Sequence, residues 1–460
     1  MAETLLSPGV LARENDQSFI QGQPVERGAA LIGPSTKGPV EIPTIVGSFS
    51  EYTAVFGGSV ESGSNLYSYF NSIAASNYFQ NGGNSLLVTR VTSGSFSPAV
   101  SSTIATGSGG PTDGLSPFVL ETISEGEIMN TGTTLLSGGA LATGSSDNIR
   151  WEIAGVNTSS GTFSLLVRRG DDTTNSKIVV EQYNNLSLDP YSSNYISKVI
   201  GDVDHTLVND GSDYYIQESG SYANASRFIR VKQVNYNTPR YFDNTGTAKN
   251  EFTGSLPVVG SGSFNGAVGS NIPTGRAANY YNNISSADSQ GLEGTDYTNA
   301  ISLMSNVDEY KYNVIAVPGL LNSEHSTQIT SIVNNTIARG DSISVIDLVK
   351  YNTTISTAIT QASGFDSSYA ATYWPWLQTI DPNIGEQVWI PASTMVPGVY
   401  AFTDASSDPW FAPAGITRGG LGQVTRAERK LSAGNRDSLY EANINPIATF
   451  PQSGVVVFGQ

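Results

Sequence analysis

Short runs of almost purely apolar residues occur in two parts of the chain that lie far apart in the sequence. Residues 28–33 and 86–91 form such runs near the beginning, and residues 312–317 and 342–347 form them in the last third. Apolar runs of this length are typical of strands buried on both faces of a helix-covered sheet. Pro318 is expected to end the third strand. Both parts of the chain therefore predict α/β structure.

Helical patterns lie between these runs. Ser48 and Glu51 have the spacing of a capping box, which predicts a short helix that ends at Gly57. A helix is also expected from residues 367–373 up to Trp374, because the proline that follows disfavours helix there. Two further stripes at helical spacing consist of Leu66, Tyr69, Phe70, Ile73, Ala74 and Tyr78, and of Ile329, Ile332, Val333 and Ile337.

The middle of the chain has a different character. Residues 93–150 are rich in Gly, Ser and Thr, and strand-like pieces follow at residues 151–153, 163–168 and 177–181. These patterns predict antiparallel strands joined by long loops. We call residues 93–289 the β-rich region.

The sequence therefore predicts a mixed α+β and α/β fold, in which a discontinuous α/β core domain is interrupted by a large β-rich insertion. Pro8, Gly9, Gly22 and Pro24 break any regular element before the first strand. The expected parts are an extended N-terminal arm (1–24), the first half of the core (25–92), the outward-protruding β-rich region (93–289, as one unit or as two split near 181–204) and the second half of the core (290–460).

Composition excludes several classes of function. The net charge of −17 argues against nucleic acid as a partner, because phosphate binding needs a basic surface. The absence of cysteine excludes disulfides, thiolate metal sites and cysteine nucleophiles. No apolar run approaches the roughly 18 residues of a membrane span, so no membrane insertion by this chain is expected.

Sequence motifs for catalysis are missing as well. Gly28 and Gly33 have the spacing of a phosphate loop, but Pro34 follows where the motif requires lysine. The two histidines, His205 and His325, lie in separate segments, which disfavours a metal cluster or a serine triad. A pair of catalytic carboxylates stays formally open among Asp341, Asp347, Asp366, Asp381 and Asp404, although exposed loops have the same composition. We therefore expect no enzyme activity, catalytic residue, cofactor or metal.

Two patterns in the β-rich region allow a binding function. Basic residues with interleaved aromatic residues could bind a polyanion, although a solvated face or a contact with an acidic subunit is the favoured interpretation; they are Arg227, Arg230, Lys232 and Arg240, with Tyr222, Phe228 and Tyr236. An alternative function, a β-rich surface protein that binds carbohydrate, would use exposed aromatic residues such as Trp151, Tyr214 and Tyr215. Trp151 lies in a strand-like run, which favours core packing for it.

The two ends of the chain contain short, extended apolar segments between Gly and Pro residues. The first segment is Leu5, Leu6, Ser7, Pro8, Gly9 and Val10. The second, near the end of the chain, includes Val455, Val456, Val457 and Phe458. Segments of this kind can add a strand to the edge of a sheet, either their own or that of a neighbour.

Several separated patches, in the same order along the chain, resemble contractile tail sheath proteins of phage tails and related injection devices. The resemblance covers roughly residues 1–92, 181–200 and 305–460. It includes Leu6-Ser7-Pro8-Gly9-Val10, Phe56-Gly57-Gly58, Asn81-Gly82-Gly83, Leu186-Ser187-Leu188-Asp189-Pro190, Arg339-Gly340-Asp341, Tyr373-Trp374-Pro375-Trp376 and Pro409-Trp410-Phe411-Ala412-Pro413. No single patch is specific for this family, but the order of the patches along the chain is.

The resemblance implies a structural subunit that polymerises helically as stacked rings around a tail tube and contracts to drive the tube through a cell envelope. Its partners would be copies of itself, the tail tube protein, and the baseplate and tail terminator proteins. Its location would be the virion tail, and the host cytoplasm during assembly. Residues 5–10 would form the arm that exchanges strands between subunits, and residues 455–458 a core strand. Family chains usually continue past this strand into a tube-facing region, whereas this sequence stops at Gln460. Either the sequence is part of a longer one, or that region lies on another polypeptide, or this sheath is unusual.

Overall fold

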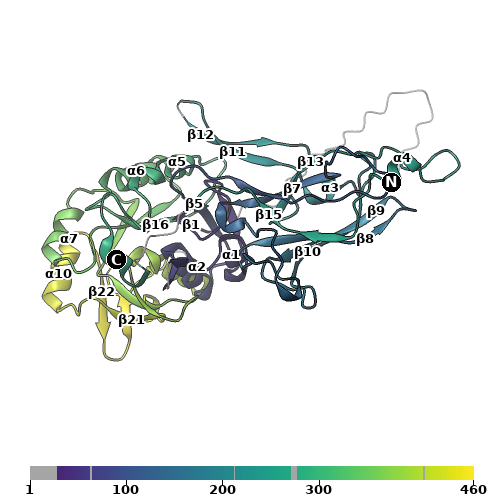
Figure 1. Ribbon diagram of the computed structural model, residues 1–460. Coiled ribbons are helices and arrows are strands. Elements are labelled where there is room, and N and C mark those ends of the chain that lie inside the picture. Colours follow the sequence, from purple (N-terminus) through teal and green to yellow (C-terminus); the bar gives the residue numbers. More distant parts are fainter. Residues whose placement is uncertain (1–27, 63–64, 212, 271–276, 408–409, 460) are drawn as a thin grey trace, which may run out of the picture.

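The computed structural model describes residues 28–62, 65–211, 213–270, 277–407 and 410–459. Figure 1 shows a helix-covered lobe at one end and an elongated lobe of β-strands, formed by the β-rich region, at the other. Strands from the beginning and from the end of the chain meet in the helix-covered lobe.

One large sheet runs through the helix-covered lobe. Its strands, in spatial order, are β2 (Thr44–Val46), β5 (Leu86–Arg90), β1 (Ala29–Gly33), β16 (Val314–Leu321), β17 (Ile343–Asp347), β18 (Ala370–Trp374), β22 (Asn445–Phe450) and β23 (Gly454–Val457). The strands from β5 to β22 are parallel to their neighbours, and the two edge strands are antiparallel. β1 pairs with β5 on one side and with β16 on the other, so it joins the two distant parts of the chain.

Strand β1 is buried on both faces, as its apolar sequence predicts. Ala29 and Leu31 pack into one hydrophobic cluster, and Ala30 and Ile32 pack into another on the opposite face. This alternation follows from the two-residue period of a strand. Gly33 ends β1 where a Cβ atom would lie 2.9 Å from Oδ1 of Asn71 in α2, so a larger residue would not fit without a shift.

Helices cover both faces of the sheet. They are α1 (Phe49–Phe56), α2 (Phe70–Gln80), α5 (Thr298–Leu303), α6 (Ser326–Arg339), α7 (Ile355–Ala362), α8 (Val396–Ser406), α9 (Gly415–Arg418) and α10 (Ala433–Glu441). The capping box of α1 is confirmed, because Ser48 Oγ accepts a hydrogen bond from Glu51 N at 3.1 Å and Gly57 follows with a φ of 76°. Helix α6, which carries the second predicted stripe, ends before Gly340, which is in the left-handed conformation.

The predicted helix with an apolar stripe from Leu66 to Tyr78 is wrong in two respects: it begins later than predicted, and it is buried on all sides and not on one face only. Leu66 is exposed and lies in β4 (Asn65–Ser68), which forms a hairpin with β3 (Ser59–Ser62). Helix α2 begins only at Phe70, and Phe70–Tyr78 are buried without interruption. A helix enclosed on all sides needs no amphipathic stripe, so the periodic pattern was misleading here.

Four other element predictions are wrong in part. Residues 370–374 form strand β18 and not a helix, since pairing with β17 and β22 overrides the local propensity. Strand β16 continues past Pro318 to Leu321, with a register shift against β17 after Ala316. The strand expected at residues 177–181 is β10 (Val179–Ser187). Phe458 lies beyond the end of β23 and outside the strand.

The β-rich region contains two antiparallel sheets that share one hydrophobic core. The first has the order β10, β9 (Thr162–Arg169), β8 (Ile149–Asn157), β14 (Gly260–Gly262), and the second has the order β13 (Ile229–Val234), β7 (Phe118–Glu125), β6 (Pro98–Ser101), β15 (Phe264–Asn265). Phe118 and Phe163 stack between the sheets with ring centroids 5.4 Å apart. The hairpin of β11 (Asp204–Asn209) and β12 (Tyr214–Ser219) extends toward the helix-covered lobe, where Leu207 and Ile216 pack beside α5 and α6.

The remaining elements are small. They are the sheet of β20 (Gln387–Ile390), β19 (Leu377–Ile380) and β21 (Val424–Ala427), the short helices α3 (Ile196–Ile200) and α4 (Asn250–Thr253), and single 3₁₀ turns at Glu127–Met129, Ser137–Gly139, Ala277–Asn283, Gly294–Tyr297 and Ala392–Thr394.

Candidate functional site

The edge of the large sheet at β23 is the first candidate for contact with another chain. Val455, Val456 and Val457 are buried, and β23 pairs with β22 on its inner side. On its outer side, Leu421 N donates to Val455 O at 2.9 Å, and Val457 N donates to Gly419 O at 2.7 Å. Residues 419–421 therefore cover this edge, and a strand added here would have to displace them.

Phe458 has a different environment from the three valines before it. Its side chain is 42% exposed, and its ring lies 5.1 Å from that of Phe450. The guanidinium of Arg436 lies over both rings, at 5.1 and 5.5 Å. The expectation that Phe458 forms part of the core strand is therefore wrong: β23 ends at Val457 and the side chain of Phe458 is exposed, although Phe458 N still donates to Pro446 O in β22 at 2.9 Å.

The opposite edge of the sheet is protected in another way. β2 is three residues long and follows Pro43, and its middle residue, Ile45, is exposed. A short edge strand next to a proline discourages pairing with another chain. The arm residues Leu5, Leu6, Ser7, Pro8, Gly9 and Val10 lie outside the described residues, so their role stays a prediction.

Buried charges join the helix-covered lobe to the β-rich region. Lys37 Nζ donates to Asp147 O at 2.9 Å, and Arg90 Nη1 donates to Glu125 O at 2.9 Å. Glu125 Oε2 in turn accepts from Val40 N at 3.0 Å. Burial lowers the pKa of Lys37, lowers that of Arg90 to about 10, and raises those of Glu125 and Asp147. Because these groups are costly to bury unless they are bonded, the junction favours one fixed arrangement of the two lobes.

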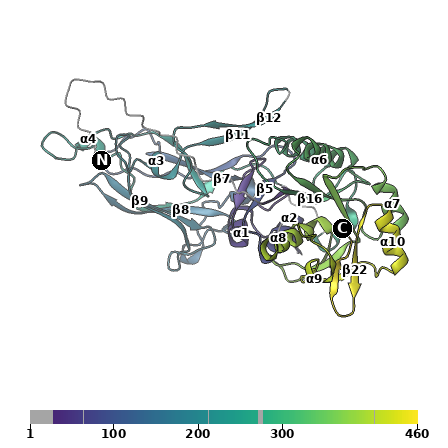
Figure 2. The ribbon, with the colours of Figure 1, turned by 180° about the vertical axis from the view of Figure 1, so that it is seen from behind.

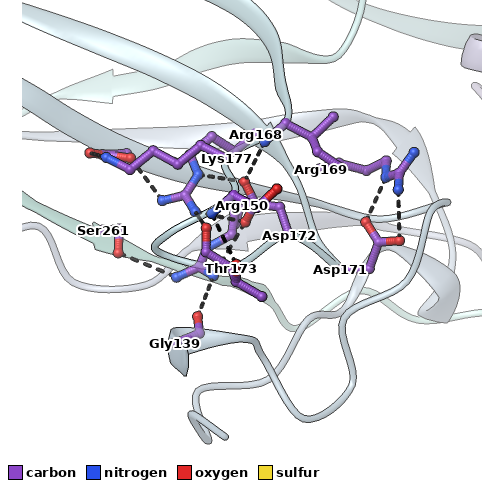
Figure 3. Close-up of polar contacts among 12 residues, drawn as sticks. Gly139, Arg150, Arg168, Arg169, Asp171, Asp172, Thr173, Lys177 and Ser261 are labelled. Carbon is purple, nitrogen blue, oxygen red and sulfur yellow. Dashed lines mark hydrogen bonds and ion pairs between the residues drawn. The ribbon is translucent and has the colours of Figure 1, made fainter. Parts of the chain in front are cut away.

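A second group of buried charges lies inside the β-rich region, on the face of β8 and β9 that points away from Trp151 (Figure 3). Arg168 contacts Asp172 through two hydrogen bonds of 2.7 Å and Glu152 through a third of 2.7 Å. Lys177 Nζ lies 2.7 Å from Glu152, and Arg150 Nη1 lies 3.5 Å from Asp172. We call these five residues the ionic network. Its members bond to one another and to nearby backbone, so the arrangement fixes loops and resembles no catalytic site.

Three of the four basic residues singled out in the sequence, Arg227, Arg230 and Lys232, are paired with acidic side chains, whereas Arg240 lies over the ring of Tyr191. Glu121 contacts both Arg230 and Lys232, and Arg227 Nη1 lies 2.8 Å from Glu51 Oε1. These residues line a groove of about 910 Å³ between β11, β7 and residues 39–45, together with further carboxylates. The favoured interpretation, a solvated face or a contact with an acidic subunit, stays a prediction, because these ion pairs lie within one chain.

The acidic residues considered for catalysis do not form a pair, because each of those described below bonds to a different partner. Asp347, at the end of β17, accepts hydrogen bonds from N and Oγ of Ser393, and burial raises its pKa to about 7. Asp381 accepts from Ser68 Oγ at 3.0 Å, and Asp341 pairs with Arg339. The hydrogen bonds of Asp347 and Asp381 connect segments that are distant in the sequence, whereas Asp341 bonds to a residue of the same turn, so all three have structural roles.

The histidines have separate roles as well. His205 lies 3.2 Å from Glu218 across the β11–β12 hairpin, and His325 Nδ1 accepts from Leu321 N at 3.2 Å at the beginning of α6. The described ranges contain no group of three or more His, Cys, Asp or Glu side chains placed to hold a metal ion. None of the helices in the part of the chain that the structure describes has the length and apolarity needed to cross a membrane.

The aromatic residues proposed for carbohydrate binding differ in their exposure to solvent. Trp151 is 4% exposed and lies in the core of the β-rich region, so it is unavailable to a ligand. Tyr215 is exposed on β12. Among the described residues, the most exposed large hydrophobic side chains are Trp410 (79%) and Tyr191 (76%), which the sequence patterns did not predict as binding residues. Trp410 was noticed only as part of a family motif, although a tryptophan between Pro409 and Pro413 in a loop is itself a sign of exposure.

Comparisons with known proteins agree on one family. Residues 290–460 match the family model described as the phage tail sheath protein central domain. A tail sheath protein of Vibrio phage KVP40 is 39% identical over 71 residues, which are 15% of this chain and 11% of the relative. The tail sheath protein of Enterobacteria phage T4 is 29% identical over 115 residues, 25% of this chain and 18% of the relative. The matched stretches thus span less than a fifth of either relative.

Solved structures similar to this chain bear sheath names as well. The sheath tail protein of Listeria innocua is 11% identical with a TM-score of 0.49, and the match covers 95% of this chain and 69% of that one. The helical sheath of the anti-feeding prophage in its contracted state is 13% identical with a TM-score of 0.38, covering 98% and 67%. The sequence matches carry the comparison: residues 290–460 match the phage tail sheath protein central domain, and the chain is similar in part to tail sheath proteins.

Proposed function

We propose that this chain is the structural subunit of a contractile tail sheath, which polymerises helically as stacked rings around a tail tube and contracts to drive the tube through the target cell envelope. The observation that carries the proposal is the sheath central-domain match over residues 290–460. The subunit would be located in the virion tail, and in the host cytoplasm during assembly. It would have no enzyme activity and no cofactor.

The proposed domain organisation follows the sequence analysis. Residues 25–92 and 290–460 would form one discontinuous core domain, with residues 93–289 inserted as a protruding part and residues 1–24 as the arm. The order of strands in the large sheet supports this division, because β1 lies between β5 and β16. The buried contacts of Lys37 and Arg90 would make the core and the insertion move together as one body.

Neighbouring subunits would be connected by their arms. An added strand with about five hydrogen bonds, at roughly 0.5–1.5 kcal/mol each, would keep subunits linked while the rigid bodies rotate. The donor would be residues 5–10, and the edge of β23 is the proposed acceptor. Because residues 419–421 cover that edge in the single subunit, strand addition would follow their displacement. Other partners would be the tube, baseplate and tail terminator proteins.

Negative-stain electron microscopy tests the proposed function. The chain would be expressed alone and together with the tube protein from the same source. Striated tubes or sleeves are the expected result, and deletion of residues 2–20 should abolish them. Monodisperse particles in the presence of tube protein would contradict the proposed function. Ordered tubes from the deletion variant would contradict the role of the arm alone.

A further inference from the structure

An exposed apolar loop follows helix α8. Trp410 is 79% exposed and Ile416 is 63% exposed, and Phe402 and Phe411 are also exposed beside them. We call these four residues the aromatic knob. The guanidinium of Arg418 lies 4.6 Å above the ring of Phe411, so a positive charge borders the knob. Large aromatic side chains next to arginine are the residue types that contribute most to binding energy at protein interfaces.

A groove of suitable size lies elsewhere on the same chain, between α7 and α10. Two adjoining hollows of about 300 and 620 Å³ share Ala362, Phe365 and Ala442 in their lining. Two carboxylates, Asp366 and Glu441, stand at this groove, and neither forms an ion pair with another described residue. Volumes of this size lie in the range of pockets that enclose a side chain or a small ligand.

The knob and the groove belong to different sides of the helix-covered lobe. Helix α9, within the knob loop, contacts α8 and β23, whereas α7 and α10 contact each other. Figure 2 shows α8 and α9 apart from the pair of α7 and α10. The knob therefore cannot occupy the groove of its own chain, but it can reach that of another copy.

Charge supports a second copy as the occupant. Each chain carries 40 acidic and 23 basic residues, so copies repel one another unless their contact pairs opposite charges. Docking the knob would bring Arg418 toward Asp366 and Glu441. Two different surface patches that join head to tail form a contact that does not close on itself, and such contacts produce open helical arrays.

We propose that the aromatic knob of one subunit inserts into the α7–α10 groove of the next. This inference rests on the proposed self-assembly and specifies one of its interfaces. It is independent of the N-terminal arm, since all residues of the knob and of the groove lie between Ile346 and Asn443.

Disulfide trapping tests the interface directly, because the chain contains no cysteine of its own. Trp410→Cys and Ser438→Cys, the latter on the exposed face of α10 beside the groove, would be prepared as separate, differently tagged chains and mixed during assembly with the tube protein. The expected result is a disulfide that joins the two tags. The matched control pairs Ser438→Cys with Tyr191→Cys, a similarly exposed aromatic position in the β-rich region.

Each outcome is informative. Trapping in the first mixture and not in the control supports the interface. Equal trapping in both, no trapping within ordered tubes, or trapping of Trp410→Cys to a cysteine placed in the tube protein would overturn it. Ordered tubes without trapping would leave the proposed function intact, whereas no ordered tubes would count against that function.

A second variant measures how much the knob contributes to the association of subunits. Trp410→Ala should weaken subunit association by about thirtyfold, the effect of removing a central interface residue, and Tyr191→Ala should leave it unchanged. Analytical ultracentrifugation with increasing protein concentration compares the two. Equal association constants for both variants would contradict the role of the knob.

Discussion

Arg168 donates two parallel hydrogen bonds to Asp172, from Nε to Oδ2 and from Nη2 to Oδ1, both 2.7 Å long and both inside the β-rich region. The side chain of Asp172 is fully buried and that of Arg168 is 2% exposed. Asp172 also accepts from Ile178 N at 2.9 Å, so one carboxylate connects β9 to the turn that leads into β10.

Replacing Asp172 by asparagine should strongly destabilise the β-rich region. The change removes one of the two carboxylates that pair with the buried Arg168 and leaves only Glu152, and breaking a buried pair costs up to about 3–5 kcal/mol. Asp171→Asn is the matched control, because the neighbouring pair of Asp171 with Arg169 is exposed and its loss should cost no more than about 1 kcal/mol. Urea unfolding gives both free energies. Similar losses for the two variants would show that the ionic network contributes little.

Asp347 should make stability depend on pH. Its pKa in the folded chain is about 7, against an ordinary value of 3.8, so the folded state holds the proton more tightly than the unfolded state. The stabilising contribution is therefore complete below about pH 4 and is lost as the pH rises through about 7, by about 4 kcal/mol in total. The free energy of unfolding of the wild type should be close to that of Asp347→Asn below about pH 4, where the carboxyl is neutral, and should fall below it as the pH rises through about 7. Asp366→Asn, at an exposed aspartate, should follow the wild type; parallel curves for all three proteins would contradict the prediction.

Two glycines should respond in opposite ways to alanine. A Cβ atom on Gly83 would lie 2.3 Å from the buried ring of Tyr78, so Gly83→Ala should cost about 1–3 kcal/mol through overpacking. Gly434 lies within α10, where nothing approaches the added methyl group, and Gly434→Ala should stabilise by about 0.5–1 kcal/mol. Thermal unfolding measures both. A stabilising effect at Gly83 would show that the ring of Tyr78 moves freely.

The contact of residues 419–421 with the outer edge of β23 should require glycine at position 419. A Cβ atom there would lie 2.4 Å from Val457 O, which would force residues 419–421 away from the strand. Loss of the hydrogen bond from Val457 N to Gly419 O, of about 1 kcal/mol, should make that amide exchange with solvent roughly five- to tenfold faster. Hydrogen–deuterium exchange detects this change. Gly422→Ala, where the space is open, is the control, and equal protection in both variants would mean that the cover tolerates the methyl group.

The sequence predicted correctly those elements that are decided by residues close to them along the chain. The capping box at Ser48 and the left-handed Gly340 are decided by residues within one helical turn, so both were predictable. The stripe that includes Leu66 failed because α2 is enclosed on every side, and β18 failed because its neighbours β17 and β22 are distant in the sequence.

The candidate sites were less predictable, because they depend on which distant segments meet. Arg150, Glu152 and Arg168 alternate with apolar residues along two strands, a pattern that is typical of a solvated face. Their burial comes from the loops at Gly139 and Thr173, which no local pattern places there. The groove between α7 and α10 likewise has no signature in either helix alone.

The position of β1 has a consequence for synthesis of the chain. β1 and β5 leave the ribosome early, but β16, the other neighbour of β1, follows only after the whole β-rich region has been made. At about 5–20 residues per second, the 231 residues from the end of β5 to the end of β16 take roughly 12–46 s. During that time one edge of β1 presents unpaired backbone, whereas β5 already has both of its neighbours, β1 and β2. The β-rich region, whose partners are nearer in sequence, can already fold. Translation speed across residues 93–289 therefore sets how long the unfinished sheet is open to aggregation.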